Sequence, residues 1–510
     1  MKTTANWPQI VAEKEARIAE LETLVKYYEA QFALAKQKQF GSSSEKGEIP
    51  EQLGLFDEAE NTSAPKQPEP ALEELSYTRR KRTGKREADL SGLPTEMVEY
   101  KLPENEQYCS VCDGALHEMA QNTRRELEII PAQVKVIERK QAVYSCRHCE
   151  KHSDHTPIVK APLPEPAIKG SLASPSAVAH IMHQKYVMCA PLYRQEQDWQ
   201  RQGVALNRQT MANWVIRCAE DWLEPLYERM KTQLLAHVVL HADETVLQVL
   251  REPGKKANTN SYMWLYRTSG EAKHPIVLYE YQPTRSSAHP RRFLEHFKGY
   301  LHTDGYDGYH KLPVTVVGCW VHMRRKFTDA LKTVTMEQRA NSNTQKAIEQ
   351  IARLFHLEVL WKDLPPDERH QRRLEEAKPL AEAFFVWLDS LSALPKMPLG
   401  KAVQYALGQK QWLMNVYLDG RTELSNNRAE NSIRPFVIGR KNWLFCNSQK
   451  GARASSVVYS IIETAKENGL KTFDYLKFLF ETVPNATTGK LDTLLPWGEA
   501  VPEQCRMSPK

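Results

Sequence analysis

The clearest hydrophobic pattern in the chain lies near its middle, where a short apolar run ends at an acid. Residues 238–242 (VVLHA) are mostly aliphatic, and Asp243 follows them directly. A run of this length between polar residues predicts a strand buried on both faces, at the centre of an α/β sheet. A carboxylate at the end of such a strand loses its hydration, so it is normally paired with a cation or binds a metal ion. This stretch alone also allows Asp243 to be a simple turn residue.

The residues that follow predict a sheet built around this strand. A polar turn precedes two stretches with strand patterns, 261–267 and 276–281, which we expect to form an antiparallel meander with it. A helical stretch, 286–297, then leads to a short strand, 299–303, that ends at Asp304. Strand, helix and strand predict a right-handed crossover to a parallel neighbour. If that neighbour is the central strand, both aspartates lie at adjacent strand ends, where open α/β sheets place their sites.

A third acid would complete a site for two hard cations, because paired ions about 3.5 to 4 Å apart can act on both oxygens of a phosphoryl displacement. Glu430 is the best candidate, in the segment SNNRAENSIRP, which predicts a helix beginning near Ser425. On that helix Glu430 falls in the second turn, where packing on both sides would hold a ligand in place. Glu423 is the alternative, but it precedes the predicted N-cap.

Four motifs stand out in this half of the chain: HADET, LHTDGYDGY, CWVHMRRKF and SNNRAENSIRPFVIGRKNWLF. Together they resemble the insertion-sequence-66 transposase family of bacteria. The resemblance continues through FGSSSEK, the paired CxxC motifs, YRQE, YSIIETAKENG and LLPW, so it covers nearly the whole chain. It departs from the family pattern at Ser42, where an Arg is common, and at Ser425, where an Asp is common.

The resemblance implies a transposase that cuts phosphodiester bonds at the ends of its element and joins the freed 3′ hydroxyls to double-stranded target DNA. It implies a ribonuclease-H-like catalytic core in which Asp243, Asp304 and Glu430 form a triad that binds two Mg²⁺ ions, with Mn²⁺ as a possible substitute. Two other functions stay open: a DNA-binding regulator with an inactive core, and a structure-specific nuclease with the same core.

Basic residues near the predicted triad are expected to contact DNA phosphates. They come from two segments of the core: Arg324, Arg325, Lys326, Arg434, Arg440 and Lys441. We expect His322 to face the DNA beside the first three, and Cys319 and Trp320 to belong to the hydrophobic core. Cys319 and His322 have the spacing of metal ligands, but two ligands do not make a zinc site.

Length, charge and cysteine content limit the number of domains and the cellular compartment that we expect. The 510 residues exceed what one hydrophobic core usually supports, so we expect at least three domains. Lys and Arg number 69 against 63 acidic residues, and this net charge of +6 is too small for the length to indicate a nucleic-acid partner by itself. Nine cysteines, with no apolar signal segment, predict a soluble protein of a reducing cytosol, without disulfides or membrane contact. The resemblance implies that this is the bacterial cytoplasm and that the protein is associated with the nucleoid.

The patterns predict a multidomain chain, with the α/β core and its helical insertion preceded by four smaller parts. The expected order is a coiled-coil helix at 1–46, a flexible linker with a basic arm at 47–100, a zinc ribbon at 101–155, a helix-turn-helix-like DNA-binding region at 165–234, the catalytic core at 235–475 with a helical insertion at about 336–418, and a C-terminal element at 476–510.

The first two parts predict self-association and DNA contact. Residues that are apolar except for Lys14 recur at steps of three and four from Val11 to Ala35, the seam of a coiled coil, which favours a homo-oligomer over a helix packed on its own chain. The resemblance leaves open small accessory proteins from the same element. Six cations in the basic arm could bind phosphates or enter a minor groove, although a solvated charge run looks the same. They are Arg79, Arg80, Lys81, Arg82, Lys85 and Arg86.

Two CxxC pairs predict a structural zinc ion. They are Cys109 with Cys112 and Cys146 with Cys149. Each pair can offer two thiolates from a tight turn, which makes a tetrahedral site. Strand patterns at 127–130 and 134–137 predict a hairpin between the pairs. A redox motif would need only one pair, and one of three nearby histidines could replace a thiolate: His148, His152 or His155.

The region 165–234 has the outline of a helix-turn-helix. We expect a helix at 192–201, a turn at Gly203 and a second helix at 208–219 with Asn207 as its N-cap. In the second helix an apolar stripe of Met211, Trp214, Val215 and Cys218 is expected to be buried. The opposite face would read DNA through Arg208, Gln209, Asn213 and Arg217. An ordinary helical hairpin with a polar outer face fits the same pattern.

Overall fold

A computed structural model describes residues 133–152 and 158–508, together with Lys14, Met97, Lys101, Ala115 and His155. The chain divides into two compact units, one of Met1–Phe40 with Lys140–Met507 and one of Gly41–Arg139 with Ser508–Lys510. The predicted coiled-coil seam apart from Lys14, the basic arm, Cys109 and Cys112 lie outside the described residues. The fold below is that of the described part of the first unit, where no helix is long and apolar enough to cross a bilayer.

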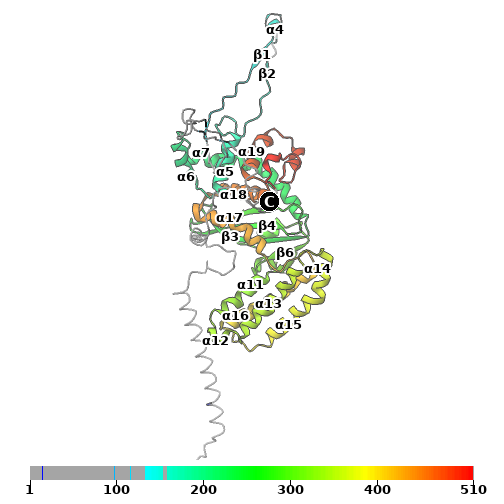
Figure 1. The fold of residues 1–510 in the computed structure, drawn as a ribbon. Coiled ribbons are helices and arrows are strands. Elements are labelled where there is room, and N and C mark those ends of the chain that lie inside the picture. Colours follow the sequence, from blue (N-terminus) through cyan, green and yellow to red (C-terminus); the bar gives the residue numbers. More distant parts are fainter. Residues whose placement is uncertain are drawn as a thin grey trace, which may run out of the picture. The chain divides into compact units, whose positions relative to one another are not determined.

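A mixed sheet lies at the centre of this unit (Figure 1). Its described strands are β3 (Val239–Arg251), β4 (Asn260–Thr268), β5 (Val277–Gln282), β6 (Tyr300–Thr303), β7 (Thr315–Gly318) and β8 (Cys446–Ser448). The order is β5-β4-β3-β6-β7, and β8 pairs with the far end of β3. Strands β3, β4 and β5 are antiparallel, and β3, β6 and β7 are parallel. The predicted meander and the parallel neighbour are therefore confirmed.

One strand boundary differs from the sequence-based expectation. The central strand does not end at Asp243 but continues to Arg251, because β4 pairs with it as far as Gln248. Strand β7 ends at Gly318, and helix α11 (Trp320–Leu331) begins two residues later. Only the first few residues of β3 pair with the parallel strand β6, so Asp243 still follows the last parallel pair.

Helices cover both faces of the sheet. Helix α17 (Asn427–Trp443) packs on β3 and β4, and α18 (Gln449–Glu467) packs on β5. Tyr279 of β5, Phe436 of α17 and Tyr459 of α18 contact one another on this face. On the other face Tyr266 stacks on Phe293 of the short helix α9 (Ala288–Phe293). Both faces of the sheet are consequently buried, as the apolar run predicted.

The predicted pair of helices before the core is confirmed. Helix α6 (Leu192–Arg201) and helix α7 (Arg208–Cys218) are joined by a turn in which Gly203 has φ +82°. The Asn207 side chain accepts a hydrogen bond from the Thr210 amide at 2.8 Å, so it caps α7 as expected. The predicted stripe of four apolar side chains is buried.

This helical region shares its hydrophobic core with the sheet. It also contains α5 (Pro175–Tyr186) and α8 (Glu224–Leu235), which follows a π-helical turn, Ala219–Leu223. Helix α5 packs on α19 (Thr472–Thr482), and one cluster of buried side chains runs from Ala167 to Cys505. The C-terminal residues add short 3₁₀ turns at Val483–Asn485, Thr488–Leu494 and Glu503–Cys505.

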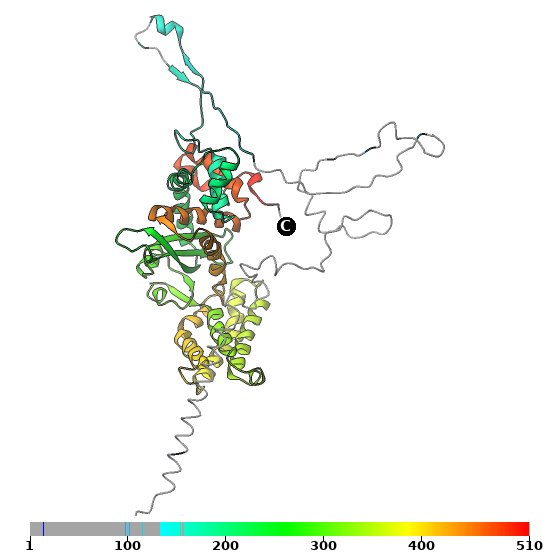
Figure 2. The same ribbon diagram turned by 90° about the vertical axis from the view of Figure 1, so that its left-hand side faces the viewer.

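A second core belongs to the helices that follow β7. They are α11 (Trp320–Leu331), α12 (Met336–Arg339), α13 (Asn343–Leu360), α14 (Pro366–Arg372), the π-helical turn Arg373–Ala377, α15 (Lys378–Asp389), α16 (Pro398–Met414) and the 3₁₀ turn Asn415–Leu418. They form a bundle, drawn in yellow-green to yellow (Figures 1 and 2). Trp320 and Phe327 of α11 pack on Phe384, so α11 belongs to the bundle with the predicted insertion.

The described part of the predicted zinc ribbon is a small hairpin. Strand β1 (Val143–Ser145) pairs with β2 (Ile158–Lys160), and α4 (Arg147–His152) lies between them. The strand expected at 134–137 is wrong, since these residues form no regular structure and the alternating side chains Val134, Val136 and Ile137 are exposed. Alternation alone does not make a strand without a partner to pair with.

Candidate active site

The two predicted aspartates are neighbours across parallel strands. The register pairs His241 of β3 with His302 of β6, and Asp243 and Asp304 each follow two residues later. Because adjacent strands lie about 4.8 Å apart, equal steps from one pair keep the two acids side by side. Asp243 accepts a hydrogen bond from the Glu244 amide at 2.8 Å, and Asp304 accepts one from the Tyr306 amide at 3.0 Å.

Two buried histidines lie beneath the aspartates. The rings of His241 and His302 stack with their centroids 4.5 Å apart, and both side chains are fully buried. Burial, together with nearby arginines, lowers the pKa of His241 to about 3, although its hydrogen bond with Asn426 acts in the opposite direction. Burial also lowers the pKa of His302, so both rings are neutral at physiological pH. They form an uncharged floor that the sequence did not reveal.

Asn426 connects this floor to helix α17. Its side chain donates to the Ala242 carbonyl at 2.8 Å and accepts from His241 Nδ1 at 3.0 Å. The residue is the N-cap of α17, so these bonds fix the start of the helix against β3. Glu430 consequently lies in the first turn of α17, beside the aspartates, and not in the second turn as the sequence suggested.

The carboxylate of Glu430 is only partly satisfied. Its Oε1 atom lies 3.7 Å from His322 Nε2, and its Oε2 atom lies 3.7 Å from Arg325. Oε1 is buried and has no hydrogen-bond partner. Glu423, the alternative third acid, is instead held by Arg428 at 2.6 Å and by the Gly270 amide at 3.2 Å.

The acids form one electrostatic cluster. The pKa of Asp243 is raised well above its ordinary value, first by burial and then by the negative charges of Glu244, Asp304 and Glu430. Such a cluster, with one buried carboxylate oxygen left without a partner, fits hard divalent cations, which prefer oxygen ligands. Glu244 is different, because its carboxylate accepts from Tyr309 at 2.5 Å and from Arg285 at 2.8 Å. We therefore assign it a structural role.

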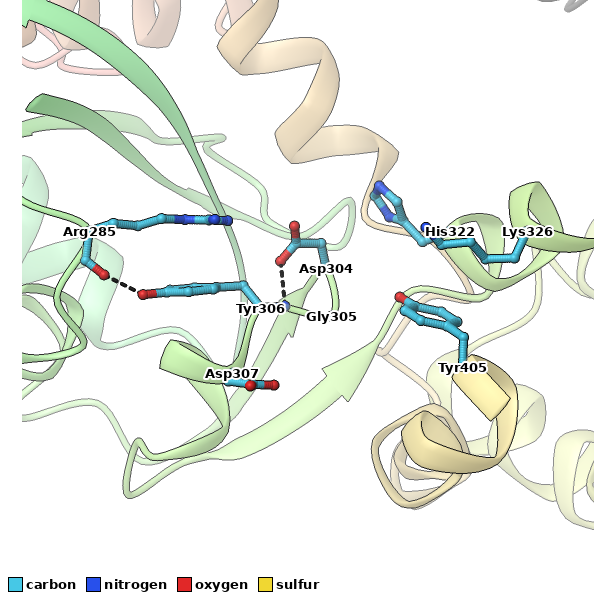
Figure 3. A pocket seen from close by; sticks show the side chains of 8 residues that line it. All are labelled: Arg285, Asp304, Gly305, Tyr306, Asp307, His322, Lys326 and Tyr405. Atoms are coloured by element: carbon cyan, nitrogen blue, oxygen red, sulfur yellow. Dashed lines mark hydrogen bonds between the residues drawn. The ribbon is translucent and has the colours of Figure 1, made fainter. Parts of the chain in front are cut away.

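An open pocket of about 370 Å³ adjoins Asp304 (Figure 3). Its lining residues are Arg285, Asp304, Gly305, Tyr306, Asp307, His322, Lys326 and Tyr405. The Arg285 guanidinium lies 3.9 Å from the ring centroid of Tyr306, on one side of the acid. The Lys326 ammonium lies 5.3 Å from the ring centroid of Tyr405, on the other. Arg285 and Tyr405 were missed by sequence reasoning, because no motif links them to the acids.

Of the basic residues predicted to contact phosphates near the acids, all but Arg440 are exposed. Arg324, Arg325 and Lys326 are exposed on α11, and Lys326 lines the pocket. On α17, Arg434 and Lys441 are exposed, but Arg440 is half-buried. Its guanidinium donates to Thr245 at 3.0 Å and to the Val246 carbonyl, so it joins α17 to β3.

The residues predicted to read DNA on α7 are exposed. They are Arg208, Gln209, Asn213 and Arg217. Arg208 lies over the ring of Tyr193, 5.7 Å from its centroid, and Arg217 pairs with Asp221 at 3.4 Å. None of the four lines the pocket beside Asp304, so any DNA contact they make would be separate from the acids.

Of the predicted zinc ligands, the structure describes the side chain of Cys146, which is exposed at the start of α4. Cys149 lies in the same helix. As predicted, Cys319 and Trp320 are buried in the core. Within the described residues, Cys319, His322 and Glu430 form the group whose donor atoms lie close enough to hold a metal, all within 4.8 Å of one another.

Comparison with known proteins identifies the family. The family model described as "Transposase IS66 family" matches residues 170–454, which is more than half of the chain and includes all three acids. The chain belongs to the IS66 transposase family. This confirms the resemblance found in the motifs. Membership of this family supports a transposase role for the protein.

Three further family models match other parts of this IS66-family chain. The "zinc-finger binding domain of transposase IS66" matches residues 106–150, which contain all four cysteines of the paired CxxC motifs. The "IS66 C-terminal element" matches 460–497, and "Transposase C of IS166 homeodomain" matches 27–98. The zinc-finger match supports a structural Zn²⁺ ion.

Similar chains occur in Sinorhizobium fredii (strain NBRC 101917 / NGR234). The uncharacterized protein y4jD is 30% identical over 432 residues, which cover 79% of this chain and 81% of that protein. The uncharacterized protein y4hP is 28% identical over 412 residues, which cover 76% of this chain and 73% of that protein. The similarity therefore extends over most of both relatives, whose names state no activity.

Proposed function

We propose that this IS66-family chain is a nucleotidyl-transfer enzyme that cuts phosphodiester bonds at the ends of its element and joins the freed 3′ hydroxyls to target DNA. The observation that carries the proposal is the register of β3 and β6, which sets Asp243 beside Asp304. The strand order, with an antiparallel meander next to parallel strands, supports the proposed ribonuclease-H-like core. Family membership supplies the transposase role.

In this proposal the three acids together would hold two Mg²⁺ ions. Asp243 and Asp304 would hold the ions jointly, and Glu430 would complete the ligands of the second. When bound, the ions would activate water or a 3′ hydroxyl and stabilise the leaving oxygen. Asn426 holds Glu430 in reach of the aspartates through its bonds to β3.

Basic side chains around the acids would hold the DNA strand. Lys326 lies on the rim of the pocket beside Asp304. Arg434 follows Glu430 by four positions on α17, so it projects from the same helix face and is exposed. Exposed cations release counterions when they bind phosphates, which makes this contribution salt-dependent and independent of sequence.

The test is an assay of the purified chain with labelled element ends, Mg²⁺ and a target plasmid. We expect end cleavage and joined products from the wild-type chain, and neither from Asp304→Asn, which keeps the side-chain size but loses a charge that holds the ions. Asp329→Asn is the matched control, because Asp329 is an exposed acid of α11 paired with Lys332 at 3.0 Å. It should act like the wild type.

Other outcomes separate the rival functions. Tight binding of element ends by a wild-type chain that never cleaves them would make the protein a regulator. Cleavage without joining to the plasmid would make it a structure-specific nuclease. Full activity of Asp304→Asn would remove the two-metal site from the proposal.

A further inference from the structure

His322 lines the pocket beside Asp304 and also lies close to Glu430, the third acid. It lies in the first turn of α11, and its Nε2 atom is 3.7 Å from Oε1 of Glu430. The same imidazole lines the pocket next to Asp304 (Figure 3). Both Glu430 Oε1 and His322 Nδ1 are buried without a hydrogen-bond partner. The imidazole and the carboxylate therefore lie close together, with 3.7 Å between Nε2 and Oε1 and no hydrogen bond between them.

The separation of these atoms is informative. A distance of 3.7 Å is too long for a hydrogen bond between nitrogen and oxygen. Two ligand atoms that each lie about 2.1 Å from one ion are separated by roughly 3 to 3.6 Å. The geometry of His322 and Glu430 is therefore closer to that of two ligands sharing an ion than to that of a bonded pair.

Backbone contacts hold the two helix starts in this arrangement. Cys319, the N-cap of α11, accepts a hydrogen bond through Sγ from the Asn426 amide at 3.2 Å. The Trp320 amide donates to the Leu424 carbonyl at 2.9 Å. These bonds tie the first turn of α11 to the segment that begins α17, and they make Cys319 a positioning residue whose sulfur is already used as an acceptor.

We propose that His322 is a fourth protein ligand of the metal site and binds the same ion as Glu430. This inference rests on the proposed function, and it adds a nitrogen ligand to a site otherwise made of carboxylates. Imidazole binds Mn²⁺ more readily than it binds Mg²⁺, which keeps oxygen ligands and water. The site therefore favours Mn²⁺ over Mg²⁺.

The experiment is electron-spin-echo spectroscopy of Mn²⁺ bound to the full-length chain. Nitrogen in the first shell of Mn²⁺ modulates the echo, and we expect ¹⁴N modulation in the wild type. Chain labelled with ¹⁵N-histidine should change this signal to that of ¹⁵N without any substitution that could disturb folding. His322→Gln should retain bound Mn²⁺ but lose the nitrogen modulation.

Controls and affinities complete the test. His296→Gln changes an exposed histidine and should keep the signal. His322→Gln should weaken Mn²⁺ binding by about 10-fold or more and should weaken Mg²⁺ binding less. Even the loss of a residue that only supports a metal ligand reduces metal affinity by about 10- to 100-fold.

Two results would overturn the inference. Mn²⁺ that binds, is lost in Asp304→Asn, and shows no nitrogen modulation would remove His322 from the site and leave the proposed function intact. A chain with no saturable Mn²⁺ binding would contradict both.

Discussion

Among single residues, Asp243 is held in an environment that disfavours its charge. Burial and three neighbouring carboxylates raise its pKa well above the ordinary value of 3.8. The folded chain therefore binds this proton more tightly than the unfolded chain does. The stabilising contribution of the protonated group is complete below the ordinary pKa and is lost as the pH rises through the raised value. Near neutral pH the unfolded chain has lost this proton, so the raised pKa of Asp243 makes the metal-free fold less stable there.

Asp243→Asn should consequently raise the thermal midpoint of the metal-free chain by a few degrees at neutral pH, with a smaller gain at low pH. The Asn side chain can still accept the bond from the Glu244 amide. Saturating Mg²⁺ should raise the midpoint of the wild type and leave the variant unchanged. Calorimetry with and without chelator measures both effects. A variant less stable than the wild type at neutral pH would contradict this account.

The third acid can be tested at the same scale. Glu430→Gln should abolish cleavage and joining under Mg²⁺, because the buried Oε1 loses its charge. Glu423→Gln should retain most activity, since a Gln oxygen can still accept from Arg428 and the Gly270 amide. Activity on labelled element ends gives the comparison. The reverse pattern would move the third ligand to Glu423.

Among the elements, α16 brings part of the helical bundle to the pocket beside Asp304. Tyr405 of α16 lines the pocket, and a Cβ atom on Gly305 would lie only 2.6 Å from its hydroxyl oxygen. Burial and the charge of Asp304 raise the pKa of Tyr405 to about 12, so the phenol keeps its proton. The absence of a side chain at Gly305 is thus what lets α16 approach the second aspartate.

Gly305→Ala should displace Tyr405 and loosen the contact between α16 and the sheet, at a cost of about 1 kcal/mol. Hydrogen exchange in α16 should become faster, and cleavage should fall by about 10-fold. Tyr405→Phe in the same chain should restore part of the loss by removing the hydroxyl.

Gly408→Ala is the matched control for this experiment. Gly408 lies on α16, the helix of Tyr405. A Cβ atom added there would have no neighbouring atom within 4 Å, so the substitution should be neutral or slightly stabilising. Equal exchange rates in the wild type and Gly305→Ala would show that α16 does not depend on this contact.

For the whole molecule, the zinc-finger region is predicted to fold independently of the catalytic core. Protein purified without chelator should contain about one zinc ion per chain, because a Cys₄ site binds one ion. Cys146→Ser with Cys149→Ser should lose the zinc and increase hydrogen exchange only near residues 101–155. Cys189→Ser, outside the ribbon, should keep the metal. If freshly prepared, reduced wild-type protein contained no zinc, the prediction of a zinc ribbon would be wrong.

The sequence by itself determined the features that depend on neighbouring residues. The α6 and α7 helices, the Asn207 cap and the buried stripe of α7 follow from hydrogen bonds and side-chain contacts within a few positions. The meander and the acid at the end of β6 follow from short apolar runs between polar turns. The family could also be read from motifs, because each motif is a short continuous segment.

Only the tertiary structure decided what surrounds the acids. The bond between His241 and Asn426 joins residues 185 positions apart, and it fixes where α17 starts and which turn contains Glu430. Tyr405 reaches Asp304 from a bundle with its own hydrophobic core, so no local pattern connects them. Likewise β3 runs past Asp243 because β4 pairs with it, and strand pairing is a contact between distant segments that periodicity along one segment does not record.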